Sequence, residues 1–148
     1  MPTVFTSVTG ARAAIASDDH CPPHVHALHR GEGWLVRVEF SYVSTRAGVI
    51  SIEPSTRAVR QRQLNQLLDD VEAHLAACRR VWWNIRGTTC LPNKWMMVHG
   101  NTVRVLDERQ PDARRVKTAL YDSSADTTRV VFWVGSDVVI PKDSGEPM

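Results

Sequence analysis

A single stretch of helical periodicity, set among segments with the two-residue alternation of strands, limits this chain to folds that mix helix and sheet. Between residues 57 and 86 the apolar side chains fall within roughly 140° of the helical wheel. These side chains are Leu64, Leu67, Leu68, Val71, Leu75, Cys78, Val81, Trp82 and Ile85. Pro54-Ser55-Thr56 precedes the pattern and Gly87 follows it, as helix start and stop signals do. We therefore expect one long helix over about residues 57–86.

Strand-like segments flank this helix on both sides. In residues 34–42 every second side chain is large and apolar, which gives an extended chain one core face. Residues 11–17 suit either a strand or a helical turn. Further strands are predicted at residues 3–9, 24–29, 48–53, 94–99, 102–107, 116–121, 129–134 and 138–140.

These elements predict an α+β fold in which a curved antiparallel sheet packs on the one long helix. At 148 residues the chain has the length of one domain. We expect a single domain over residues 1–148, made of an α+β part over residues 1–88 and a β-rich C-terminal extension over residues 89–148.

Composition excludes few partners. The 18 Lys and Arg against 16 Asp and Glu leave a net charge of +2, which is too small to imply a nucleic acid or a membrane surface by itself. The first residues lack the segments of a signal peptide, and no apolar run approaches the ~20 residues of a membrane span. The three cysteines are odd in number and show no CxxC spacing, so we expect no disulfide framework and a cytoplasmic location.

The richest chemistry lies in the segment DDHCPPHVHALH, which begins at Asp18 and holds four of the six histidines. His24 and His26 are two apart on a predicted strand, so their side chains share a face. His20 can approach them from the loop that precedes the strand. This spacing predicts one divalent metal ion, such as zinc, held by His20, His24 and His26.

Neighbouring residues extend this prediction. Asp19 is a candidate fourth ligand, or an acceptor that orients an imidazole, and Cys21 is a softer alternative ligand. Glu32 is a candidate base for a metal-bound water. Two other interpretations stay open: a metal-free polar pocket, and a purely structural role in which the histidines bond to backbone carbonyls beside Pro22 and Pro23.

Two arginines lie at the start of the predicted helix, where its dipole disfavours cations. Arg57 and Arg60 extend the face that the leucines use. They are either arginines that snorkel at the rim of the core or an anion-binding patch at a helix N-terminus.

The N-terminal pattern resembles the DUF4160 family. The resemblance rests on the start MPTVF, on Gly10 and Arg12, and on the sequence DHCPPHVH from Asp19 to His26, since family members begin MPTV or MPTI and carry a DHxPPHxH core. It covers roughly residues 1–86, in which members run through strands into a helix that ends near a tryptophan. Residues from 90 onward have no counterpart in the family.

The resemblance implies a small cytoplasmic bacterial protein from an accessory-gene, mobile-element or toxin–antitoxin-like neighbourhood. It marks Asp19, His20, His24 and His26 as motif positions. The family has no established chemistry, so the resemblance implies a setting and not a reaction.

Two classes of function follow. The first, which we prefer, is a binding or regulatory protein that contacts another protein or a nucleic acid and no membrane. The second is a metal-dependent hydrolase or nuclease that uses His20, His24 and His26, with Asp19 or Glu32 handling protons.

Geometry separates these classes. Three groups that converge in a cleft favour an enzyme, whereas splayed histidines and an exposed patch near Trp83 or Trp95 favour a binding module. The oligomeric state stays open, and a dimer through edge strands of the C-terminal third is one candidate.

Overall fold

The computed structural model describes residues 1–145 and forms two compact units. The first comprises Met1–Phe40 and Ala47–Arg86, and the second comprises Ser41–Arg46 and the chain from Gly87 onward. Within the described residues there are two helices and two antiparallel five-stranded sheets, one sheet in each unit. The α+β class is therefore confirmed.

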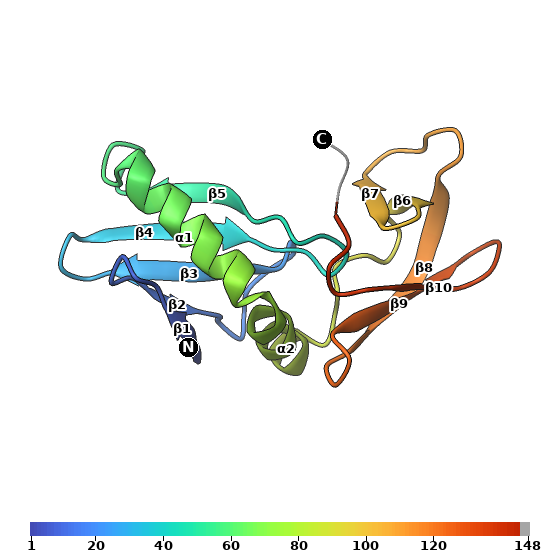
Figure 1. Ribbon diagram of the computed structural model, residues 1–148, viewed down its shortest axis with the longest axis horizontal. Helices are drawn as coiled ribbons and strands as arrows, with labels where there is room; N and C mark the ends of the chain where they lie inside the picture. The colour runs from blue at the N-terminus through green and yellow to red at the C-terminus, as the bar shows by residue number, and fades with distance from the viewer. Residues whose placement is uncertain (146–148) are drawn as a thin grey trace. The chain divides into compact units, whose positions relative to one another are not determined.

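The sheet of the first unit is a meander whose strand order, β1-β2-β3-β4-β5, follows the chain, as Figure 1 shows. Its strands are β1 (Thr3–Thr6), β2 (Arg12–Ala14), β3 (His24–His29), β4 (Trp34–Glu39) and β5 (Gly48–Glu53). The predicted bounds of β3 and β5 are confirmed. The predicted strand at 34–42 ends at Glu39, and the ambiguous residues 11–17 contribute β2.

The two faces of this sheet differ in burial. Val25 and Ala27 of β3 are fully buried, whereas Leu28 is 39% exposed. Side chains alternate between the two faces of a strand, and residues paired between neighbouring strands lie on the same face. The strand register therefore extends the buried and the exposed face from β3 to β4. Ala27 pairs with Val36 of β4 on the buried face, and Leu28 pairs with Leu35 on the other.

The helical region is divided into α1 (Gln61–Ala73) and α2 (Leu75–Arg86), so the expected single helix over residues 57–86 is wrong in its start and in its continuity. The start moves because the backbone of Arg60 is extended and its N–H donates to Oε1 of Gln63 at 3.2 Å. Such a side-chain acceptor satisfies a backbone donor that the helix itself cannot pair. Within residues 1–145, neither helix is long and apolar enough to cross a membrane.

The break between the helices lies at His74. Its ring stacks on Phe5 of β1, with ring centroids 4.4 Å apart, and its Nδ1 donates to the backbone oxygen of Asp70 at 2.8 Å. The imidazole shares the Asp70 carbonyl with the backbone N–H of His74, which donates to it at 3.1 Å, while the backbone of His74 leaves helical geometry (φ −110°, ψ 24°). The packing of β1 on the helical region therefore sets the break, and the local periodicity carries no sign of it.

The carboxylate of Asp70 joins α1 to the end of β1. Its Oδ2 accepts hydrogen bonds from Ser7 Oγ (2.6 Å) and from the Val8 N–H (3.0 Å), and its Oδ1 accepts one from Gln66 Nε2 (2.9 Å). Burial opposes ionisation of Asp70, but these hydrogen bonds outweigh it and hold the pKa of the carboxyl below its ordinary value.

The sheet of the second unit has the strand order β10-β9-β8-β6-β7. Its strands are β6 (Trp95–His99), β7 (Thr102–Leu106), β8 (Arg114–Asp122), β9 (Thr127–Phe132) and β10 (Val138–Ile140). Tyr42 belongs to this unit: its ring packs edge-on against Tyr121 at 4.9 Å, and its carbonyl oxygen accepts a hydrogen bond from Thr128 Oγ1 at 3.1 Å. The β-rich C-terminal part of the predicted fold is thus confirmed.

Cys78 of α2 is a free, fully buried thiol, and burial raises its pKa to about 12.

The Asp70 network predicts a pH-dependent loss of stability. We expect Asp70→Asn to lower the free energy of unfolding by about 1–2 kcal/mol, because hydrogen bonds to a charged acceptor are stronger than those to a neutral one. Since folding lowers the pKa of Asp70, this contribution is full above about pH 4 and is lost as the pH falls through the folded-state pKa. Urea denaturation at neutral and acidic pH measures both effects.

Asp69→Asn is the matched control for this experiment. It removes the same charge from the adjacent position, but the carboxylate of Asp69 is exposed and makes no hydrogen bond or ion pair with another described residue. We expect it to change the free energy of unfolding by less than about 0.5 kcal/mol. Equal losses in the two variants would contradict the role of the Asp70 network.

Candidate functional site

A short loop before β3 is closed by Asp19. Its Oδ2 accepts a hydrogen bond from the Ala16 N–H at 2.8 Å, and its own N–H donates to the Ala16 carbonyl oxygen at 3.3 Å. The guanidinium of Arg86, at the end of α2, donates to the carbonyl oxygen of Ser17 at 2.7 Å. Because Asp side chains readily bond to nearby backbone, the position of Asp19 is encoded locally and then fixed by α2.

Asp19, His24 and His26 form a compact group, which we call the Asp19 cluster. His26 Nε2 donates to Asp19 Oδ1 at 2.8 Å, and His24 Nε2 lies 3.7 Å from the same oxygen. One potential ligand atom from each of the three residues lies within 4.8 Å of the others. The shared face predicted for His24 and His26 explains why both imidazoles reach one carboxylate.

The cluster is largely shielded from solvent. The side chains of Asp19, His24 and His26 are 9%, 10% and 13% exposed. The His24 ring lies 5.6 Å from the ring of Trp82 in α2 and 5.0 Å from that of His26, measured between centroids. Polar groups removed from water need partners, so the environment favours a ligand that satisfies the remaining lone pairs.

The imidazole of His24 is oriented by the backbone. Its Nδ1 lies 2.8 Å from the carbonyl oxygen of Pro22, and because a carbonyl only accepts, Nδ1 carries the hydrogen. In the neutral ring Nε2 then presents a lone pair toward the cluster. An imidazole held through a backbone carbonyl is the usual arrangement of a metal-ligating histidine.

The residues of the cluster fit a divalent transition metal. Two imidazole nitrogens and one carboxylate oxygen are ligands that zinc prefers, and three protein ligands leave a position for a fourth group. Tetrahedral bonds of about 2.0–2.1 Å place ligand atoms about 3.3 Å apart. The observed separations from Asp19 Oδ1, 2.8 Å and 3.7 Å, bracket that value, so small side-chain rotations bring the three atoms to a shared ion.

Two residues of the predicted site lie outside the cluster. The side chain of His20 is exposed and is not a member of the ligand group, although it adjoins Asp19 in the chain. Cys21, the softer alternative ligand, is not a member of the ligand group either. The carboxylate of Asp19 takes the place predicted for the imidazole of His20.

Glu32 and His29 form a separate arrangement at the other end of β3. The Thr9 carbonyl accepts a hydrogen bond from His29 Nε2 (3.0 Å), while the Glu32 N–H donates to His29 Nδ1 (3.0 Å). The Glu32 carboxylate accepts hydrogen bonds from Gln63 Nε2, the shorter being 2.9 Å. The five steps of β3 between His24 and His29 span about 17 Å, so Glu32 has no route to the cluster as a base.

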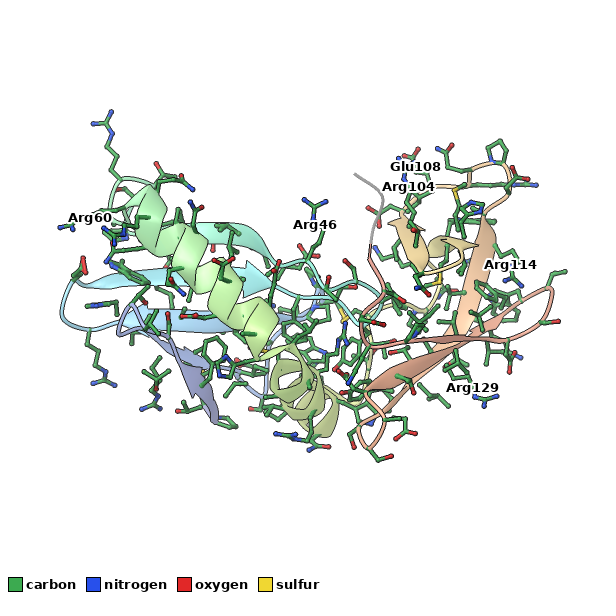
Figure 2. The ribbon with its side chains drawn as sticks, in the orientation of Figure 1. Arg46, Arg60, Arg104, Glu108, Arg114 and Arg129 are labelled. Carbon is green, nitrogen blue, oxygen red and sulfur yellow. The ribbon has the colours of Figure 1, made fainter. Side chains whose placement is uncertain are left out.

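Arg57 and Arg60 lie before α1, and both are exposed. Figure 2 shows Arg60 where the chain enters α1. Their separation from the Asp19 cluster follows from the position of Gln63, which binds Glu32 beyond the far end of β3. The pair therefore lies apart from the cluster, and its role as an anion-binding patch stays a prediction.

The aromatic residues named as a binding surface are only partly exposed. Trp83 and Trp95 are half-buried, and the guanidinium of Arg109 lies 6.0 Å from the centre of the Trp95 ring. Trp133, by contrast, is 55% exposed and carries Lys117 5.2 Å from its ring centroid.

The structure also holds a groove that the sequence analysis missed, with a volume of about 460 Å³. It is lined by Met1, Gly10, Arg12, Ala14, His26, Leu28, His29, Arg30, Gly31 and Leu35. We call it the β3 groove. The groove forms because Arg12 of β2 pairs in register with Leu28 of β3. The alternation within a strand shows which face a residue lies on, but it does not show which residue lies opposite on the next strand.

Comparisons with protein-family models, with curated protein sequences and with solved structures found no match to this chain.

The hydrogen-bond pattern predicts different tautomers for three histidines of one strand. In the neutral form of each ring, we expect His24 to carry its hydrogen on Nδ1 and His26 and His29 to carry theirs on Nε2. Long-range ¹H–¹⁵N correlation spectra of the metal-free protein distinguish the two forms. A hydrogen on Nε2 of His24 would contradict the orientation that we assign to this ring.

Proposed function

We propose that this chain is a binding or regulatory protein whose first unit holds one divalent transition-metal ion, zinc in the simplest case, at Asp19, His24 and His26. The observation that supports the proposal is the approach of His24 Nε2 and His26 Nε2 to the same carboxylate oxygen. The lone pair of His24 Nε2 and the carboxylate of Asp19 repel each other in this shielded site. A cation bound between them would offset that repulsion.

The ligand count suggests what such an ion does. Three protein ligands leave at least one coordination position for another donor. In a binding protein, that donor comes from the partner, which is another protein or a nucleic acid. DUF4160-like membership, a bacterial accessory-gene setting and a cytoplasmic location belong to the same proposal and rest on the sequence alone.

A metal-dependent hydrolase or nuclease is the second candidate. The same open position favours it, because a metal-bound water is an effective nucleophile. The arrangement of carboxylates argues against the hydrolase, because it leaves no carboxylate base beside the metal ligands. Asp19 is itself a ligand, no other carboxylate joins the group in the described part of the chain, and Glu32 lies beyond the other end of β3.

Metal analysis of untagged protein tests the proposed site. We expect wild-type protein dialysed against zinc and then against buffer to retain about one ion per chain. His24→Ala and His26→Ala each remove one ligand and should lose that ion. His20→Ala, which alters an exposed imidazole outside the cluster, should retain it.

Two outcomes would contradict the site. Zinc retained by both His24→Ala and His26→Ala would place the ion elsewhere in the chain. Zinc lost from His20→Ala would restore the ligand set predicted from the sequence spacing. Circular dichroism of each metal-free variant shows whether a loss of zinc reflects a missing ligand or an unfolded chain.

Hydrolysis of bis(p-nitrophenyl) phosphate by the zinc-loaded protein separates the two functions. A binding protein should give no turnover above that of His24→Ala. Turnover that is lost in His24→Ala and retained in Glu32→Gln would favour the hydrolase, with Glu32 excluded as its base.

A further inference from the structure

We infer that the β3 groove binds a small carboxylate with an apolar body. This site is distinct from the proposed metal site, although His26 contributes to both. The volume of about 460 Å³ falls within the range of small-molecule pockets, roughly 300–1,000 Å³. The inference does not depend on whether a metal is bound.

The apolar part of the groove is a row of side chains on adjacent strands. Leu28 of β3 pairs with Leu35 of β4, and alternation places both on the face away from the core. Leu28 is 39% exposed, and Leu35 lines the groove beside it. The two leucines together give the groove its apolar surface. Ala14 of β2 leaves room at the next position along the same face, where it pairs with His26.

Two cations lie at one end of the groove. Arg12 pairs in register with Leu28, and Arg30 follows Leu28 by two residues as the chain enters the β3–β4 turn. Neither guanidinium makes a hydrogen bond or an ion pair with another described residue. Arginines without a carboxylate partner beside an apolar hollow are suited to an anionic head group, which a guanidinium binds in a bidentate manner.

The nearby carboxylates do not pair with these arginines. Glu53, which pairs in register with Leu35, binds the guanidinium of Arg37 at 2.8 Å. The carboxylate of Glu32 contacts Gln63 and His29 instead of Arg12 or Arg30. The charge of Arg12 and Arg30 is therefore available to a ligand, while the charge of Arg37 on the same face is already paired.

This arrangement defines the ligand. Its carboxylate lies at Arg12 and Arg30, and its apolar body covers Leu28 and Leu35. The far end of the body approaches His26, which limits its length to that of an aryl acid or a medium-chain alkyl acid.

Fluorescence titration with 2-naphthoate tests the inference, with 2-naphthol as the neutral analogue of the same apolar body. The titrations are run in EDTA, so that failure of the proposed metal site has no effect on them. We expect saturable binding of 2-naphthoate and an affinity about tenfold weaker for 2-naphthol. The methyl resonances of Leu28 and Leu35 should shift on titration.

Variants then assign the cations. Arg12→Gln combined with Arg30→Gln should weaken 2-naphthoate binding by about tenfold and leave 2-naphthol binding within roughly twofold. Arg62→Gln combined with Arg80→Gln is the matched control, because it removes two exposed guanidiniums of α1 and α2 that do not line the groove, and it should change neither affinity by more than about twofold. Equal affinities for the two probes, no saturable binding, or an unchanged affinity in the double variant would each overturn the inference.

Discussion

The carboxylate of Asp19 is the group on which the candidate site depends. One of its oxygens accepts the Ala16 N–H and closes the loop before β3, and the other faces the imidazoles of His24 and His26. Removing this carboxylate would free the loop and leave two imidazoles without a common partner in a shielded position. One carboxylate oxygen of Asp19 therefore holds the local fold and the other determines the chemistry of the site. For this reason the site requires an aspartate as well as the two histidines.

Strand β3 organises the rest of the first unit's chemistry. Its first half presents His24 and His26 to Asp19, and its second half presents Leu28 to the β3 groove, while His29 bonds to Thr9 and Glu32 at the turn. Three histidines of one strand thus have three different surroundings. His26 touches both the cluster and the groove, so a ligand in the groove and an ion in the cluster would meet at one imidazole.

Local sequence patterns predicted the features that depend on neighbouring residues in the chain, such as strand bounds and side-chain faces. The bounds of β3 and β5 and the shared face of His24 and His26 follow from alternation. The break at His74 did not follow, because it arises from stacking on Phe5, which lies about seventy positions earlier in the chain. Arg12 escaped notice because its role depends on its pairing with Leu28. His20 was preferred to Asp19 as a ligand because spacing alone does not show that a loop closes on its own aspartate.

A crystal structure of the zinc-soaked protein, with data collected on both sides of the zinc absorption edge, tests the central claim most directly. We expect one anomalous peak between Asp19, His24 and His26, about 2.0–2.2 Å from Asp19 Oδ1, His24 Nε2 and His26 Nε2. A cluster without a peak, with the 2.8 Å contact between His26 and Asp19 intact, would contradict it and leave the three residues as a structural hydrogen-bond network.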